Sequence, residues 1–188
     1  DTPPTAAPAG ASPAGDLGQM RREYSDRGLR REELLPDALA QFEVWFKQAC
    51  EAGVLEPNAM SLATVSAEGQ PTLRTVLLKS FDRRGFVFFT NLDSTKSRQI
   101  AGNPNVALLF AWLPLERQVI ILGRAEKLST AEVLKYFITR PFGSQLAAWT
   151  SPQSQIITSR SLLEMKLAEM KRKFADGKVP LPSFWGGY

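Results

Sequence analysis

The sequence predicts a mainly β protein with peripheral helices, in which a meander of strands closes into a barrel. Between residues 59 and 128, apolar and polar side chains alternate in five or six short segments joined by tight turns. Segments with a helical period of apolar residues flank this region. Residues 106–112 are apolar on both faces, so one face can fill the barrel while the other needs a helix or a second subunit to cover it.

The composition is typical of one globular domain with a modest positive charge. The chain has 188 residues, 44% of them apolar, and a formal net charge of +4, which suits anionic small molecules as well as nucleic acid. Because there is no histidine, triads and metal sites built on it are excluded, and we expect no metal. The single cysteine, Cys50, favours a reducing, cytoplasmic compartment. No apolar run reaches the roughly 20 residues of a membrane-spanning helix.

The N-terminal part divides into a tail and a helix. We expect residues 1–17 to be disordered, because Pro, Ala and Gly dominate there, and residues 18–188 to form one domain. Residues 37–54 predict a helix that Asp37 caps and Gly53 ends. Its apolar stripe consists of Leu39, Phe42, Trp45, Phe46 and Ala49.

Five strands and a short helix follow. The strands are expected at 59–66, 71–81, 86–91, 106–114 and 117–128. The turns at 67–70 and 82–85 contain glycine, and the second of them joins the second and third strands as a hairpin. A short helix over 94–104 comes next, and a two-residue link joins the last two strands.

Two further helices are expected near the C-terminus. The segment 129–141 begins with a serine and a threonine, either of which can cap a helix. The segment 159–174 has the spacing of a capping box at Ser161 and Glu164. The segment 143–155 between them is predicted to be irregular and polar.

The start of the 94–104 helix is a candidate anion site. Free backbone N–H groups and the helix dipole favour an anion there, and Lys96 adds a full charge; the alternative is an ordinary helix start with an exposed lysine. Arg74 and Lys79 lie in the neighbouring strand and can clamp phosphate, or each can reach water at a strand end. On one unbroken strand, their side chains would point to opposite faces.

A third constellation is Tyr136, Arg140 and Ser144. The tyrosine and the arginine are four residues apart on one helix face, and the serine follows in the loop, which suits a phosphate ester; the alternative is an exposed surface pair. The amide of Gln118 and the polar pair at 153–154 suit the polar rim of a flat heterocycle, although such residues are also common without any function.

Five stretches of the sequence, taken in order, form a specific pattern. They are MRREYSDRGLRR, RTVLLKSFDRRGFVFFTNLDSTKSRQI, ERQVIILGRAEKLS, KYFITRPFGSQLAAWTSPQSQ and VPLPSFWGGY. From about residue 18 to residue 188, the chain resembles the pyridoxine (pyridoxamine) 5'-phosphate oxidase family. The resemblance implies an FMN-binding split β-barrel homodimer with FMN at the subunit interface. It also implies oxidation of pyridoxine or pyridoxamine 5'-phosphate to pyridoxal 5'-phosphate, with dioxygen reduced to hydrogen peroxide.

The resemblance assigns binding roles to particular residues. Those implied for FMN are Arg74, Thr75, Val76, Leu77, Leu78, Lys79, Phe89, Thr90, Thr95, Lys96, Gln118, Gln153 and Ser154. Those implied for the substrate are Lys79, Tyr136, Arg140 and Ser144, with Arg21 and Tyr24 from an N-terminal arm. No residue is assigned a catalytic role, because the flavin carries out the redox chemistry.

The sequence departs from the family pattern at three places. Thr95 stands where the family usually has an arginine, so we expect one contact to the cofactor phosphate to be weakened or replaced. Ile138 stands where a histidine is common, and we expect little functional loss. The chain ends at Tyr188, whereas the family continues with a tryptophan and an arginine for FMN and an Arg-Leu-His stretch for the substrate.

Three other functions stay open on the sequence alone. The first is a truncated, non-catalytic protein that binds FMN or pyridoxal phosphate, and the second is another split-barrel flavoprotein such as a flavin reductase. The third is nucleic-acid binding, which we do not expect because the basic residues are dispersed. Formation of peroxide, consumption of NAD(P)H and salt-sensitive binding of DNA distinguish these functions.

Overall fold

A computed structural model describes residues 19–20, 23, 28–150 and 160–188. The chain divides into two units, one that ends at Leu34 and one that runs from Leu35 to Tyr188. The described part of the first unit is exposed and contains the 3-10 helix η2 (Arg31–Glu33). The tail expected over residues 1–17 lies outside the described residues.

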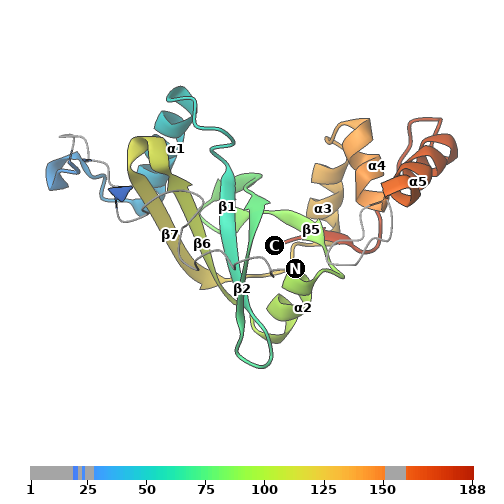
Figure 1. The fold of residues 1–188 in the computed structure, drawn as a ribbon, viewed down its shortest axis with the longest axis horizontal. Coiled ribbons are helices and arrows are strands. Elements are labelled where there is room, and N and C mark those ends of the chain that lie inside the picture. Colours follow the sequence, from blue (N-terminus) through green and yellow to red (C-terminus); the bar gives the residue numbers. More distant parts are fainter. Residues whose placement is uncertain (1–18, 21–22, 24–27, 151–159) are drawn as a thin grey trace, which may run out of the picture. The chain divides into compact units, whose positions relative to one another are not determined.

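A four-stranded antiparallel sheet is the main element of the second unit (Figure 1). Its strands, in sheet order, are β2 (Pro71–Leu77), β1 (Ala59–Val65), β6 (Asn105–Trp112) and β7 (Arg117–Arg124). The predicted turn between β1 and β2 is confirmed, and Gly69 supplies its positive φ of 84°. The 3-10 helix η3 (Leu113–Leu115) joins β6 to β7, so this link is longer than the two residues expected.

Two smaller sheets have two strands each. They are β3 (Ser80–Asp82) with β4 (Gly85–Val87), and β5 (Phe89–Asn91) with β8 (Trp185–Gly187). The second pair places the last described strand beside the middle of the chain, and Tyr188 extends the pairing through two backbone hydrogen bonds with Phe88 at 3.0 and 3.1 Å.

The strand expected over 71–81 is interrupted, because the chain changes its hydrogen-bond partner. Leu78 N–H donates to the carbonyl of Asn58 just before β1, at 2.8 Å. Lys79 N–H donates to the carbonyl of Val87 in β4, also at 2.8 Å. The chain thus leaves the large sheet at Leu78 for a separate hairpin. The predicted pairing with 86–91 is therefore wrong for β2, which pairs with β1.

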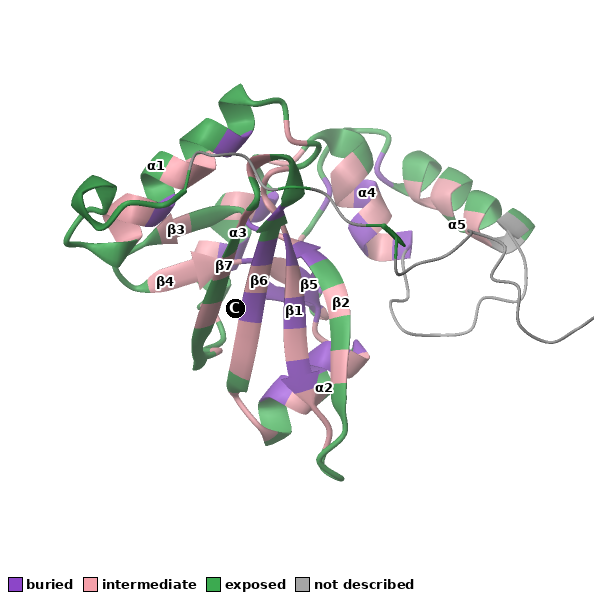
Figure 2. Cartoon of the chain, turned by 60° about the vertical axis from the view of Figure 1, so that its left-hand side comes forward, coloured by how far each residue is buried: buried purple, intermediate pink, exposed green. Residues whose placement is uncertain are grey.

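Helix α1 (Ala38–Glu51) forms where the apolar stripe predicted it and packs on one face of the large sheet. The Asp37 side chain accepts a hydrogen bond from Leu39 N–H at 3.2 Å, which confirms the predicted cap. The ring of Phe42 is buried, with centroid distances of 5.0 Å to both Phe81 and Phe110. Figure 2 shows the buried residues of β6 and β1 that form this core.

Four more helices lie in the described part of the second unit. They are α2 (Thr95–Gly102), α3 (Thr130–Phe137), α4 (Phe142–Thr150) and α5 (Arg160–Lys173). Helix α3 begins with a capping box between Ser129 and Glu132, which confirms the serine as its cap. Helix α5 begins at Arg160, so Ser161 lies inside its first turn rather than before it.

Helix α4 overturns the prediction that 143–155 is irregular, at least up to Thr150. Its Leu146 and Ala148 are buried in a second core cluster, together with Val133 and Phe137 of α3. Polar neighbours hide this apolar face in the sequence.

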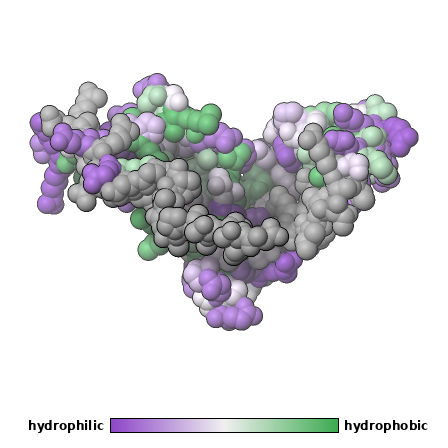
Figure 3. All heavy atoms as spheres, viewed as in Figure 1, coloured by the Kyte–Doolittle hydropathy of each residue, from purple (hydrophilic) through white to green (hydrophobic). Residues whose placement is uncertain are grey.

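One face of the large sheet, which we call the outer face, is apolar and exposed within the described residues. Leu73, Ala63, Ala107 and Leu122 lie opposite one another in one row across its four strands. Leu73 is 71% exposed and Leu122 is 79% exposed. The described part of this unit therefore does not cover the second apolar face that the sequence predicted. At the end of the sheet, the β1–β2 turn is hydrophilic and forms the lower tip in Figure 3.

Candidate active site

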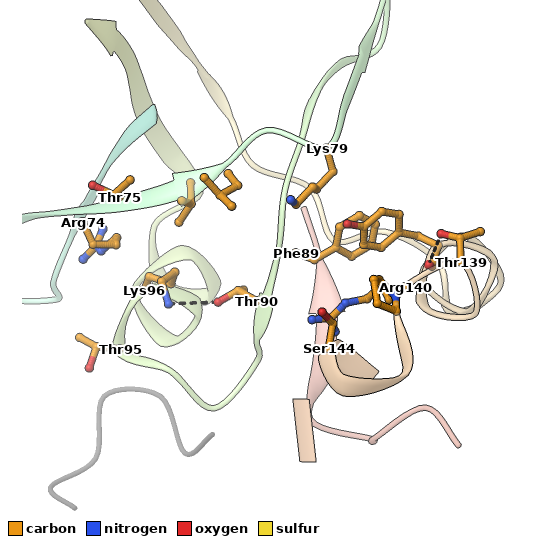
Figure 4. A pocket seen from close by; sticks show the side chains of 14 residues that line it. Arg74, Thr75, Lys79, Phe89, Thr90, Thr95, Lys96, Thr139, Arg140 and Ser144 are labelled. Carbon is orange, nitrogen blue, oxygen red and sulfur yellow. Dashed lines mark hydrogen bonds between the residues drawn. The ribbon is translucent and has the colours of Figure 1, made fainter. Parts of the chain in front are cut away.

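A cavity of about 790 Å³ lies where β2, β5, α2 and the segment between α3 and α4 meet (Figure 4). Of the residues predicted to bind FMN, it gathers residues 74–77, Lys79, Phe89, Thr90, Thr95 and Lys96. Of the residues predicted to bind the substrate, it gathers Lys79, Tyr136, Arg140 and Ser144. Thr139 and Pro141 also line the cavity and were not predicted.

The change of partner at Leu78 explains how Arg74 and Lys79 reach the same cavity. On an unbroken strand, their side chains would lie on opposite faces. Because the strand ends at Leu77, Lys79 projects from a different segment and lines the cavity together with Arg74. Leu78 itself does not line the cavity; it is 5% exposed and belongs to the core.

Polar groups of β1, β2 and α2 hold the guanidinium of Arg74. Its Nη1 donates to the Leu62 carbonyl at 2.9 Å and to the Thr64 hydroxyl at 2.6 Å. Its Nη2 donates to the Thr72 hydroxyl and, at 3.4 Å, to Oε1 of Gln99. These acceptors are all uncharged. Burial lowers the pKa of Arg74 from its ordinary value, since desolvation disfavours the charged form.

Lys96 brings a second cation into the same part of the cavity, from the first turn of α2. Its Nζ donates to the Thr90 hydroxyl at 3.0 Å (Figure 4) and to the Ser94 hydroxyl at 3.2 Å. Burial and, to a smaller extent, the charge of Arg74 lower the pKa of the lysine. No Asp or Glu is among the described residues that line the cavity. Among the described lining residues, the charged side chains are therefore all positive.

Stacked aromatic rings border the other side of the cavity. The Tyr136 ring lies parallel to that of Phe89, with a centroid distance of 4.0 Å and an interplanar angle of 8°. The Phe89 ring stacks in turn on Trp185 of β8 at 5.1 Å and 4°. Burial raises the pKa of Tyr136, while the charge of Arg140 opposes this change. The phenol therefore stays neutral and can donate a hydrogen bond.

Arg140 lies against this aromatic stack, in the segment after α3. Its guanidinium carbon is 4.7 Å from the centre of the Trp185 ring, a cation–π contact. Its Nη1 is buried and has no hydrogen-bond partner among the described residues. Ser144 points toward the guanidinium in Figure 4. Since a buried charged donor without an acceptor is costly, an anion at this position would stabilise the arrangement.

The remaining predicted residues are not part of the described cavity. Gln118 lies on β7, exposed on the outer face of the sheet. Gln153, Ser154, Arg21 and Tyr24 lie outside the described residues, so their roles stay predictions.

Sequence reasoning missed two residues that support the cavity wall. Trp185 stacks on Phe89 and makes a cation–π contact with Arg140, and Gln99 contacts Arg74. A Trp-Gly-Gly run and a glutamine one turn after Lys96 were the available signals, and neither specifies a partner. Among the described residues, no helix is long and apolar enough to cross a bilayer, and no group of potential ligands could hold a metal ion.

The fold and the cavity define the class of protein as a split β-barrel of the FMN-binding type. A solved structure of PhzG from Burkholderia lata 383, in complex with tetrahydrophenazine-1-carboxylic acid, matches with a TM-score of 0.79 and 27% identity over 86% of this chain and 80% of that one. A pyridoxamine 5'-phosphate oxidase-related, FMN binding protein from Nostoc punctiforme matches with a TM-score of 0.62 and 16% identity over 82% of this chain and 79% of its own, which supports the fold alone.

The chain belongs to the pyridoxamine 5'-phosphate oxidase family. The model of that family matches residues 46–174. A pyridoxine/pyridoxamine 5'-phosphate oxidase from Rippkaea orientalis is 65% identical over 173 residues, which are 92% of this chain and 82% of the relative. The enzyme of the same name from Crocosphaera subtropica is 63% identical, over 92% of this chain and 81% of its own. The resemblance stated from the sequence is confirmed.

Proposed function

We propose that the protein is an FMN-dependent oxidase that converts pyridoxine or pyridoxamine 5'-phosphate to pyridoxal 5'-phosphate, with dioxygen as the acceptor and hydrogen peroxide as a product. The observation that carries this proposal is the distribution of charge in the cavity. Arg74 and Lys96 lie on one side, Lys79 and Arg140 also line it, and no carboxylate is among the described lining residues. These four cations form two pairs, which suit two phosphorylated ligands, and the names of the relatives supply the substrate class.

The pair of Arg74 and Lys96 suits the FMN phosphate. Each cation is partly desolvated, and the charge of Arg74 lowers the pKa of Lys96. A phosphate dianion between them would replace this repulsion with attraction and favour the charged form of the lysine. The first turn of α2 adds backbone N–H groups and the positive end of the helix dipole.

Arg140, with Lys79, Tyr136 and Ser144, suits the substrate phosphate. The Nη1 of Arg140 has no acceptor among the described residues, and the cation–π contact with Trp185 holds the guanidinium in place. A planar guanidinium in a fixed orientation offers two parallel hydrogen bonds to a phosphate. The cavity thus offers one pair of cations to the phosphate of FMN and another pair to the phosphate of the substrate.

The residues of this chain contribute binding and alignment. Bound FMN would supply the redox chemistry, as hydride acceptor and as the group that dioxygen reoxidises. Cations that grip the substrate phosphate, away from the reacting carbon, would use remote binding energy to orient the ring on the flavin. The described lining contains no side chain whose ordinary pKa lies near neutrality, so we assign no general acid or base to it.

We also propose that the protein is a cytoplasmic homodimer. The outer face of the sheet exposes Leu73, Ile120 and Leu122, and a second copy of the chain would bury them. Gln118 lies on the same face, on β7 near Ile120 and Leu122. In such a dimer, we propose that it would contact the FMN bound to the other subunit. The single cysteine is consistent with a reducing compartment.

The test is an oxidase assay on the purified protein after reconstitution with FMN. We expect flavin absorption bands that stay with the protein after gel filtration, and peroxide formation with pyridoxamine 5'-phosphate. A flavin-loaded protein that produces no peroxide would favour a non-catalytic binding protein, and consumption of NAD(P)H would favour a flavin reductase. A protein that takes up no FMN at micromolar concentrations would contradict the proposal as a whole.

A further inference from the structure

Gln99, which does not line the cavity, closes a hydrogen-bond network behind Arg74. The network joins α2 to β1 and β2 through Thr64, which is fully buried, and Thr72. The guanidinium of Arg74 donates to both threonine hydroxyls. Both hydroxyls donate in turn to Oε1 of Gln99, the second at 2.8 Å. A hydroxyl group has one proton, so each threonine can accept from Arg74 and pass on one hydrogen bond.

The direction of these hydrogen bonds makes the amide oxygen of Gln99 the final acceptor. Arg74 Nη2 also donates to this oxygen at 3.4 Å, so three donors converge on it. Arginine has donors only, and Gln99 is the nearest acceptor for both threonine hydroxyls, since the other acceptor within reach of Thr72, the Thr64 carbonyl, is farther away at 3.4 Å. Without an acceptor at position 99, the protons of Thr64 and Thr72 would lose this partner, and the orientation of Arg74 would no longer be fixed from behind.

All the groups that accept hydrogen bonds from Arg74 in this network are uncharged. Arg74 contacts one carbonyl, two hydroxyls and one amide oxygen. A carboxylate at position 99 could accept the same hydrogen bonds, but it would neutralise Arg74. The neutral amide instead leaves the positive charge available to the cavity, where the same charge already acts on Lys96.

We propose that Gln99 is a positioning residue, which orients Arg74 through a neutral acceptor so that its full charge serves the phosphate of the ligand. This inference rests on the proposed binding of FMN. It predicts that the identity of residue 99 changes how strongly the phosphate of the cofactor binds and leaves binding of the flavin ring nearly unchanged. A purely structural role would affect both together.

The test compares FMN with riboflavin, which has the same ring system and no phosphate. The dissociation constants of both are measured by fluorescence quenching on the apoprotein of the wild type and of Gln99→Glu. We expect the variant to bind FMN about tenfold or more weakly, because a carboxylate now competes for Arg74, while riboflavin binding changes less than about twofold. Its unfolding temperature should not fall, since the carboxylate can accept the same hydrogen bonds.

The matched control is Gln48→Glu. The Gln48 side chain also accepts a hydrogen bond from an arginine, Arg117, and neither residue lines the cavity. This control should bind both flavins like the wild type. Gln99→Met, which has a similar length and no comparable acceptor, should also lose FMN more than riboflavin, so the inference stays testable if the glutamate variant does not fold.

Two outcomes would overturn the inference alone. One is a Gln99→Glu variant that binds FMN like the wild type, and the other is a variant that loses FMN and riboflavin to the same extent. A wild-type protein that binds no FMN would instead contradict the proposed function, and the inference would fall with it.

Discussion

Arg140 combines a buried charge, a ring contact and an unsatisfied donor. In Arg140→Lys the positive charge remains, but the planar group that stacks on Trp185 and the second parallel donor are lost. We therefore expect the KM for pyridoxamine 5'-phosphate to rise about tenfold, with FMN affinity unchanged. Steady-state kinetics with saturating FMN measures the first quantity, and flavin titration measures the second.

The control for this prediction is Arg83→Lys, because the side chain of Arg83 is 88% exposed and does not line the cavity. It should leave both quantities unchanged. If Arg140→Lys kept the wild-type KM, the substrate phosphate would have to bind elsewhere.

Lys96 predicts how FMN affinity depends on pH. Burial and the charge of Arg74 lower its pKa, so the free protein loses this proton at a pH below the ordinary lysine value of 10.5. A bound phosphate favours the charged lysine, and FMN affinity should therefore fall as the pH rises through the lowered pKa. In Lys96→Arg this alkaline decrease should disappear, since arginine stays charged.

The measurement is a flavin titration at several pH values between 7 and 10. The phosphate is a dianion throughout most of this range, so its own ionisation contributes little. Riboflavin serves as the control ligand, because it has no phosphate that could interact with the charge of the lysine. An FMN dissociation constant that stays constant to pH 10 in the wild type would contradict the assignment of Lys96.

The pairing of β5 with β8 determines which side chains fit between the two strands. A Cβ atom added at Gly187 would lie 2.8 Å from the Phe89 ring, 2.9 Å from Leu128 and 3.0 Å from the backbone carbonyl of Phe88. We expect Gly187→Ala to lower the free energy of unfolding by about 1–3 kcal/mol through overpacking. Because Phe89 lines the cavity, the variant should also bind the substrate more weakly.

Gly123→Ala is the matched control, since a Cβ atom at Gly123 in β7 would meet nothing within 4 Å. Thermal and urea unfolding of both variants measures the difference. Equal stabilities would show that the neighbours of Gly187 move aside without cost.

The sequence predicted those elements whose signals are local. Helix α1 was placed by its apolar stripe and its cap Asp37, and α3 by a cap at Ser129 or Thr130, because a cap and its helix lie within a few residues. The break of the strand at Leu78 could not be predicted, since it depends on a hydrogen bond to the carbonyl of Asn58, twenty residues away, just before the chain turns to pair with Val87. For the same reason, the sequence identified the cation Arg74 as a candidate for phosphate binding, but it did not identify the neutral Gln99 that contacts it.

At the scale of the whole molecule, the outer face predicts the state of association. In Leu122→Glu a charge would lie in the middle of the proposed interface, at a position that is 79% exposed in the single chain. We expect the proposed dimer to dissociate at micromolar protein concentrations, with a parallel loss of FMN affinity because the site would lose the contribution that we propose for the partner. Analytical ultracentrifugation measures the first effect.

Leu55→Glu controls for the added charge, because Leu55 is 92% exposed and lies outside the large sheet. It should remain a dimer with wild-type FMN affinity. A Leu122→Glu protein that sediments like the wild type would contradict the proposed interface.

The residues described around the cavity include no histidine, Asp or Glu, which has a consequence for acid stress. The described lining has no group that ordinarily takes up a proton between pH 5 and 8, so a drop in cellular pH would leave its electrical state unaltered. The small molecules would respond instead, since a phosphate monoester gains its second proton near pH 6. Any change in binding on mild acidification would then come from protonation of the phosphates of the vitamers and the coenzyme rather than from the protein.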